Sequence, residues 1–187
     1  MTGPRHPYAR VFTTGFEAGE FWTSSPSNGN MAIVTDRVRT GTYAMRYTAV
    51  SGTKSTIQLP GPSGSGYSSS PDLFFRGYLY IESLPSTARA ILGTSTTTTS
   101  AGHAYVKLNS DGTMSLTVGS TTYGTTASGL SVNTWYRIEW ALGGSTGKQS
   151  LRIDGDDVVT GVTGRTTTNM ASPIICGIDT VSSTMTM

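Results

Sequence analysis

Apolar residues alternate with polar residues at every second position along most of the chain. The clearest runs lie within residues 43–48, 74–81, 103–108, 114–118, 135–142 and 151–153. Successive side chains of a β-strand point to opposite faces, so this period predicts strands with one face on a core and the other outward. No segment shows the 3.6-residue period of an amphipathic helix. The pattern therefore confines the chain to an all-β fold.

Short turn sequences separate these runs. Asn109–Gly112 and Asp154-Gly155 each lie between two runs, as in tight hairpins, and Gly143–Gly147 joins two more. Many short antiparallel strands with a turn every ~8–12 residues are typical of a sandwich or barrel. We expect an N-terminal arm at residues 1–10 and a single domain at 11–187.

Composition excludes several classes of protein. The chain holds 32 threonines, 24 serines and 23 glycines, and only 13% of its residues are charged, which disfavours helix bundles and coiled coils. Its 36% hydrophobic content argues against full disorder. The net charge of +2 comes from scattered basic residues, so we expect no nucleic-acid partner. No apolar run approaches the ~20 residues of a membrane span, so we expect no membrane insertion.

Neither the single cysteine nor the N-terminus points to a secreted, disulfide-bonded protein. Cys176 lies in an apolar stretch and has no partner for a disulfide or a CxxC motif, so we interpret it as a core residue. The first 17 residues lack the apolar segment of a Sec signal peptide. We therefore expect synthesis and folding in a reducing cytoplasm.

Four segments, in this order and spacing, resemble the concanavalin A-like lectin/glucanase superfamily in its laminin-G-like form. They are Thr14–Glu17, Thr40–Arg46, Asn133–Glu139 and Leu151–Gly155. The resemblance spans about residues 12–180, and the chain looks like domains found in virion proteins of tailed bacteriophages. It implies a jelly-roll sandwich of two antiparallel sheets.

One departure from the family concerns the end of the chain. Relatives continue past the segment that matches residues 176–187 with a further strand, whereas here an alternating strand stops at Met187. We expect either that the sequence continues beyond this point or that a neighbouring subunit completes the edge, as edge strands allow.

Enzymatic motifs are absent or explained otherwise. Glucanases of this superfamily carry E-x-D-x-x-E on one strand, and this chain has no such motif. Its one acidic pair at i, i+2, Asp154 and Asp156, straddles a predicted turn, whereas glycosidases hold two carboxyl groups across the sugar. Gly143-x-Ser145-x-Gly147 resembles a nucleophile elbow, but a strand follows it where a helix is required. We expect no enzymatic activity.

A metal site has one candidate. Asp154, Asp156 and Asp157 crowd one turn, and such oxygen-rich clusters bind Ca²⁺. Asp-Gly turns also occur for backbone reasons alone, because Gly accepts φ > 0 and Asp caps the turn. We expect no required cofactor.

The outward residues of the alternating runs form the candidate binding surface. They are Arg76, Tyr78, Tyr80, Tyr105, Lys107, Trp135, Arg137 and Glu139. Aromatic rings and hydrogen-bonding charges suit a sugar ring, which has apolar C–H faces and polar edges. If their strands share a sheet, these residues would line one concave face. The alternatives are ordinary cross-strand pairs or a layer buried against another subunit.

Two functions remain open, and they are compatible. The first is a non-enzymatic phage virion protein, either a capsid decoration or a minor tail or fibre domain, with virion proteins or further copies of itself as partners. The second is a carbohydrate-binding module that attaches to a host-surface glycan. An endo-glycanase is a third alternative, which the missing motif disfavours.

Overall fold

The computed structural model describes residues 16–18, 30–49, 55–58, 73–94, 104–118, 120–142, 148–163, 175–178 and 185–186. The predicted arm at residues 1–10 lies outside them. The described residues contain thirteen strands and no helix, so they include no helix long and apolar enough to cross a membrane. The all-β prediction is confirmed.

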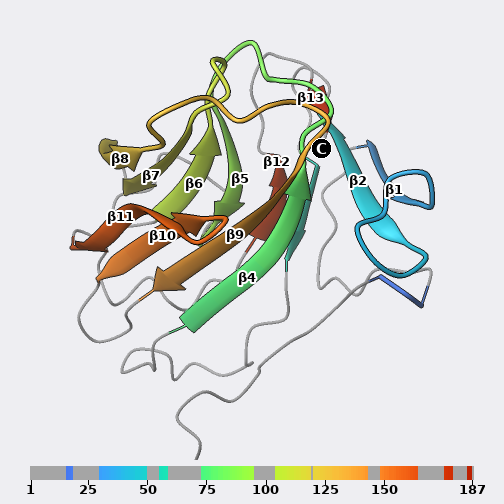
Figure 1. Ribbon diagram of the computed structural model, residues 1–187, viewed down its shortest axis with the longest axis horizontal. Helices are drawn as coiled ribbons and strands as arrows, with labels where there is room; N and C mark the ends of the chain where they lie inside the picture. The colour runs from blue at the N-terminus through green and yellow to red at the C-terminus, as the bar shows by residue number, and fades with distance from the viewer. Residues whose placement is uncertain are drawn as a thin grey trace, which may run out of the picture.

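The strands form three antiparallel sheets (Figure 1). A four-stranded sheet has the order β11-β10-β9-β4, a six-stranded sheet has the order β3-β12-β5-β6-β7-β8, and a smaller sheet has the order β1-β2-β13. The strand bounds are β1 Asn30–Val34, β2 Ala44–Ala49, β3 Ser55–Gln58, β4 Leu73–Tyr80, β5 Arg89–Gly93, β6 Ala104–Leu108, β7 Met114–Val118, β8 Thr121–Thr125, β9 Trp135–Leu142, β10 Gln149–Ile153, β11 Asp156–Val162, β12 Ile175–Ile178 and β13 Met185–Thr186.

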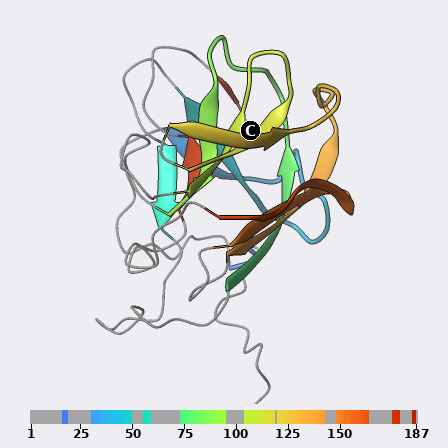
Figure 2. The ribbon, with the colours of Figure 1, turned by 90° about the vertical axis from the view of Figure 1, so that its left-hand side faces the viewer.

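The core lies between the four-stranded and six-stranded sheets, which form two layers in the side view (Figure 2). Alternate residues of the facing strands fill it, as the sequence period predicts. Its buried members include Val106, Leu108, Met114, Leu116, Ile138, Trp140, Leu142, Leu151 and Ile153. Each such side chain contributes about 1.5–3 kcal/mol relative to an exposed one. The indole N–H of Trp140, its only polar side-chain group, has a hydrogen-bond partner, because Nε1 donates to Gln149 Oε1 at 3.3 Å.

Both predicted tight hairpins are confirmed. Asp154 and Gly155 have φ of 54° and 102° between the paired residues Ile153 and Asp156, and a two-residue turn with two positive φ values matches the twist of the strands. Gly112, with φ of 82°, closes the β6–β7 hairpin, where its N–H donates to the carbonyl of Asn109 at 3.0 Å.

One edge of the sandwich closes where β8 approaches β11. A Cβ built on Gly124 would lie 2.5 Å from Val159 Cγ2 and 3.0 Å from the carbonyl oxygen of Val158. Only a residue without a side chain fits this distance.

Near the end of the sequence, β13 pairs with β2 through Met185 and Ala49. The expectation that either the sequence continues beyond this strand or a neighbouring subunit completes the edge stays a prediction.

Candidate functional site: the outer face of β4 and β9

Strands β4 and β9 bring six of the eight predicted site residues onto one surface. Their register pairs Arg76 with Glu139, Tyr78 with Arg137, and Tyr80 with Trp135. Residues directly opposite in an antiparallel pair lie on the same face, and the intervening residues Phe75, Leu79, Ile138 and Trp140 face the core. We call the outward set, Phe74, Arg76, Tyr78, Tyr80, Trp135, Arg137 and Glu139, the β4–β9 face.

Two of the four aromatic side chains on this face are open to solvent, and the other two, Tyr80 and Trp135, are half-buried. Phe74 is 64% exposed and Tyr78 45%, and they are two of the three large hydrophobic side chains exposed in the described part of the chain. Tyr80 and Trp135 form a tilted pair with ring centroids 5.3 Å apart and planes at 53°. The Tyr80 hydroxyl donates to Asn133 Oδ1 at 3.3 Å, which fixes this ring at the end of the row. Four positions at a spacing of two residues give a row about 20 Å long on β4.

Charged groups interleave with the rings. Glu139 lies between two arginines: Arg76 Nε donates to its Oε1 at 2.8 Å, and Arg137 Nε lies 3.5 Å from its Oε2. One carboxylate thus faces two guanidinium groups. The Arg76 side chain is 68% exposed, so it retains donors that face solvent. The Arg137 side chain is 36% exposed, and its Nε is buried without a hydrogen-bond partner.

Two of the three aspartates proposed for Ca²⁺, Asp154 and Asp157, have other roles where the structure places them. Asp154 Oδ1 accepts the backbone N–H of Arg137 at 2.7 Å, and the carboxylate of Asp157 is paired with Arg152. Within the described residues no group of three or more His, Cys, Asp or Glu side chains is placed to hold a metal ion. The turn interpretation therefore accounts for Asp154 and Gly155, and the expectation that the protein requires no cofactor stays a prediction.

A loop from the smaller sheet adds a residue that the sequence analysis missed. Arg39, between β1 and β2, places its guanidinium carbon 3.6 Å from the centroid of the Tyr78 ring. This cation–π contact brings loop 35–43 alongside β4, the edge strand of its sheet. No local sequence signal joins positions 39 residues apart, so only the fold reveals the contact.

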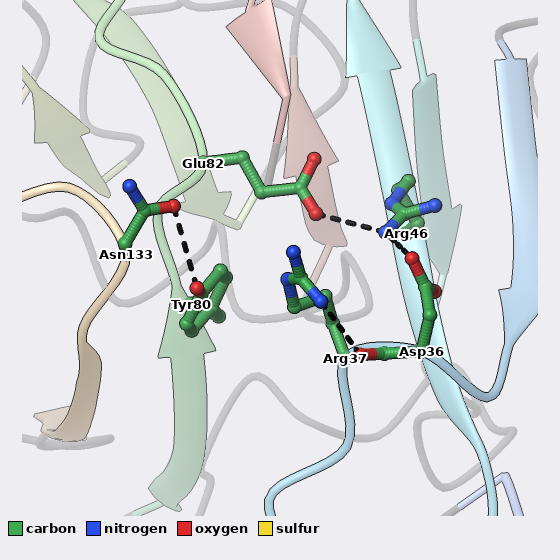
Figure 3. Close-up of polar contacts among 6 residues, drawn as sticks. All are labelled: Asp36, Arg37, Arg46, Tyr80, Glu82 and Asn133. Carbon is green, nitrogen blue, oxygen red and sulfur yellow. Dashed lines mark hydrogen bonds and ion pairs between the residues drawn. The ribbon is translucent and has the colours of Figure 1, made fainter.

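An ion-pair network fixes the start of this loop (Figure 3). Arg46 Nη2, on β2, lies 2.8 Å from both Asp36 Oδ2 and Glu82 Oε1. Glu82 lies two residues after Tyr80, the last residue of β4. The hydrogen bond from Arg46 holds the pKa of Asp36 below its usual value, and the bond to Asp36 raises the pKa of Arg46. The network ties the smaller sheet to the end of β4.

The end of the same loop is held by Glu17. Its Oε2 accepts the backbone N–H of Thr42 at 2.9 Å. Gly41 has φ of 83°, and a Cβ there would lie 2.1 Å from Glu17 Oε1. Glu17 thus contacts the turn at Gly41 and Thr42, and the two sides of this contact belong to segments that the sequence comparison singled out separately.

The structure corrects the placement of Tyr105 and Lys107. Both lie on β6 of the six-stranded sheet, opposite the core-facing residues Ala104 and Val106. Tyr105 is only 1% exposed and Lys107 is half-buried. The expectation that all eight residues line one face is wrong for these two, because alternation along a strand does not specify which sheet the strand joins.

Comparison with known proteins supports the fold. No family model and no curated protein matches the chain. The solved structure of the cellulose-induced protein Cip1 matches 92% of this chain and 91% of its own, with a TM-score of 0.56 at 13% identity.

Two structures of Trypanosoma rangeli sialidase also match. A mutant with trans-sialidase activity matches with a TM-score of 0.52 at 15% identity, and a complex with 2,3-difluoro-KDN with 0.53 at 13%. They cover 84% and 86% of this chain, which spans only 26% and 28% of those sialidase chains. These likenesses confirm the concanavalin A-like jelly-roll sandwich.

Proposed function

We propose that this domain is a non-catalytic carbohydrate-binding domain that holds a glycan on the β4–β9 face. The observation that carries the proposal is the exposed aromatic row of β4, in which Phe74 and Tyr78 alternate with Arg76. An exposed apolar surface set among ordered polar groups marks a site of interaction. A sugar ring stacks its C–H face on an aromatic ring and offers hydroxyl groups to charged neighbours.

The charged groups on the face favour adhesion over hydrolysis. Glycoside hydrolysis uses two carboxyl groups, one of which acts as an acid with a raised pKa. On the β4–β9 face the carboxylate of Glu139 is engaged by two arginines. The pKa values of two carboxyl groups elsewhere in the described residues, Asp36 and Asp111, are shifted, and in both cases hydrogen bonds lower them. Our proposal therefore assigns the face binding without bond cleavage, and a reducing-end assay on the bound polysaccharide should detect no products.

A comparison of variants tests this proposal and distinguishes the contribution of the Tyr78 ring from that of its hydroxyl group. We expect Tyr78→Ala and Trp135→Ala to weaken binding to a polysaccharide, measured by affinity electrophoresis across a glycan panel, by about tenfold or more, which is ~1.4 kcal/mol. Tyr78→Phe keeps the ring and should retain binding. Tyr105→Phe on the other sheet should leave binding unchanged. Equal binding by Tyr78→Ala, Trp135→Ala and the unmodified domain would refute the proposal.

We also propose, on the sequence resemblance alone, that the domain works in a phage virion, as a capsid decoration or a tail component. This role is compatible with glycan adhesion, because a surface-exposed virion domain contacts the host envelope. Immunogold electron microscopy of intact particles tests it: label on heads or tails is expected. Particles that lack the protein would refute the assignment and leave the glycan proposal standing.

A further inference from the structure

We infer that the glycan held on the β4–β9 face is acidic, and that loop 35–43 recognises its anionic groups through Arg39 and Arg37. This inference rests on the proposed glycan-binding function and adds the chemical class of the ligand. It comes from the pairing of the charged groups around the aromatic row.

The two loop arginines differ from the other arginines of this surface in forming no ion pair with a carboxylate of the described residues, but Arg37 lies near Asp36, whose pKa is lowered by the hydrogen bond from Arg46 and also by the charge of Arg37. Arg39 makes only the cation–π contact with Tyr78, and Arg37 donates from Nη1 to the backbone carbonyl of Asp36 at 2.9 Å. Arg76 and Arg137 share Glu139, and Arg152 is paired with Asp157. Arg39 therefore carries a positive charge beside Tyr78 that no carboxylate of the described residues neutralises.

The position of Arg39 suits recognition of an anion on a bound sugar. Its guanidinium is planar and has five N–H donors in a fixed fork, which matches a carboxylate or a sulfate or phosphate ester. Stacking on Tyr78 uses the face of the guanidinium and leaves its edge donors available. A sugar stacked on the neighbouring rings would thus meet these donors at its polar edge.

The loop is held in place before any ligand arrives. The Asp36–Arg46–Glu82 network fixes its first residues, and the Glu17 carboxylate fixes Thr42 at its end. Binding groups on an ordered loop lose less conformational entropy than groups on a mobile one. Arg39 is therefore presented at a fixed position beside Tyr78, and Arg37 is held against the backbone carbonyl of Asp36 in the same loop.

The same charges favour an acidic glycan over a nucleic acid. A nucleic-acid surface is a continuous basic stripe that follows closely spaced phosphates. Here Glu139 and Asp157 interrupt the arginines across the sheet and would repel a phosphate backbone. A polysaccharide with one anionic group per sugar residue can be recognised by a local positive charge, such as that of Arg39 beside Tyr78.

The test compares polymers that differ in charge alone. Polygalacturonate and its fully methyl-esterified form supply a carboxylate pair, and dextran sulfate and dextran supply a sulfate pair. We expect binding of one acidic member at least about tenfold tighter than its neutral counterpart, and weaker binding as salt rises. The pair that shows the preference identifies the anionic group.

Substitutions assign the preference to the loop. Arg39→Gln should abolish most of the preference for the acidic polymer, and Arg37→Gln should reduce it. Arg152→Gln removes the same charge from β10, in the sheet that carries the β4–β9 face, but breaks a neutralised pair, so it should retain the preference. Arg39→Lys should fall between, because Lys keeps the charge and loses the fork.

The outcomes separate this inference from the proposed function. Equal binding of acidic and neutral polymers, still sensitive to Trp135→Ala, would overturn the inference and leave the glycan site intact. Loss of preference in Arg152→Gln equal to that in Arg39→Gln would also overturn it, since general electrostatics would then suffice. Binding to a single-stranded oligonucleotide in preference to every polysaccharide would overturn both.

Discussion

Gly124→Ala tests how the two sheets meet. The added methyl group would lie 2.5 Å from Val159 Cγ2, on a β-branched side chain that cannot swing away, and 3.0 Å from the backbone oxygen of Val158. One of these groups must move, so β8 and β11 must separate or Val159 must shift into the core. The backbone of Gly124 is not left-handed, so the expected effect arises from this contact rather than from backbone strain.

The magnitude follows from the contact. Overpacking a dense core costs about 1–3 kcal/mol, offset by the ~0.4–1 kcal/mol gained because Ala restricts the unfolded chain. We expect a net loss of about 1–2 kcal/mol. Val159→Ala alone should cost about 2 kcal/mol, because Val159 is 4% exposed and its removal leaves a cavity. In the double variant the new methyl group occupies that space, so the loss should be smaller than the sum by about 1 kcal/mol.

Urea denaturation monitored by tryptophan fluorescence measures these differences, and each kcal/mol should lower the Tm by about 2–4 °C in a chain of this size. Gly124→Ala combined with Val118→Ala, a core valine outside the contact, should be additive. Additive behaviour of the Gly124 and Val159 substitutions would refute the close approach of β8 and β11.

Three further predictions concern single residues. Gly41→Ala should cost about 1–2 kcal/mol from its φ of 83° and should also displace Glu17; an unchanged urea midpoint would contradict this. Because the pKa of Asp36 is lowered in the folded state, its pairing with Arg46 stabilises the loop above about pH 4 and is lost as the pH falls through the folded pKa, below 3.8. NMR titration should therefore show loop 35–43 loosening in acid, and Asp36→Asn should be loosened at every pH; a loop unchanged at low pH would contradict this. Gly155→Ala, at φ of 102°, should destabilise the β10–β11 hairpin by about 1–2 kcal/mol without altering the m-value, and an unchanged Tm would argue against the two-residue turn.

The β4–β9 face could be predicted from the sequence because it depends only on the alternation of side chains along each strand and on the antiparallel pairing of the two strands. Alternation assigns Tyr78 and Arg137 to the outer side of their strands, and antiparallel pairing then aligns the two outer sets. The turn at Asp154-Gly155 was also predictable, because a two-residue hairpin turn needs a positive φ at both positions and few residue types adopt one.

Other features depend on long-range packing. The period of β6 shows that Tyr105 faces away from Val106, but it does not show that this side is buried. Strand β5, Arg89–Gly93, is buried along its whole length and carries three consecutive apolar residues, Ala90–Leu92, so its sequence shows no alternation. The contact of Arg39 with Tyr78 depends on the smaller sheet lying beside β4, which no short segment encodes.

A structure of the domain bound to a glycan oligosaccharide would test the central claim most directly. Our account predicts a sugar stacked on the aromatic row of β4, next to Tyr78, with an anionic group within hydrogen-bond distance of the Arg39 guanidinium. An oligosaccharide bound on the six-stranded sheet, or a β4–β9 face covered by a second protein chain in place of a sugar, would contradict it.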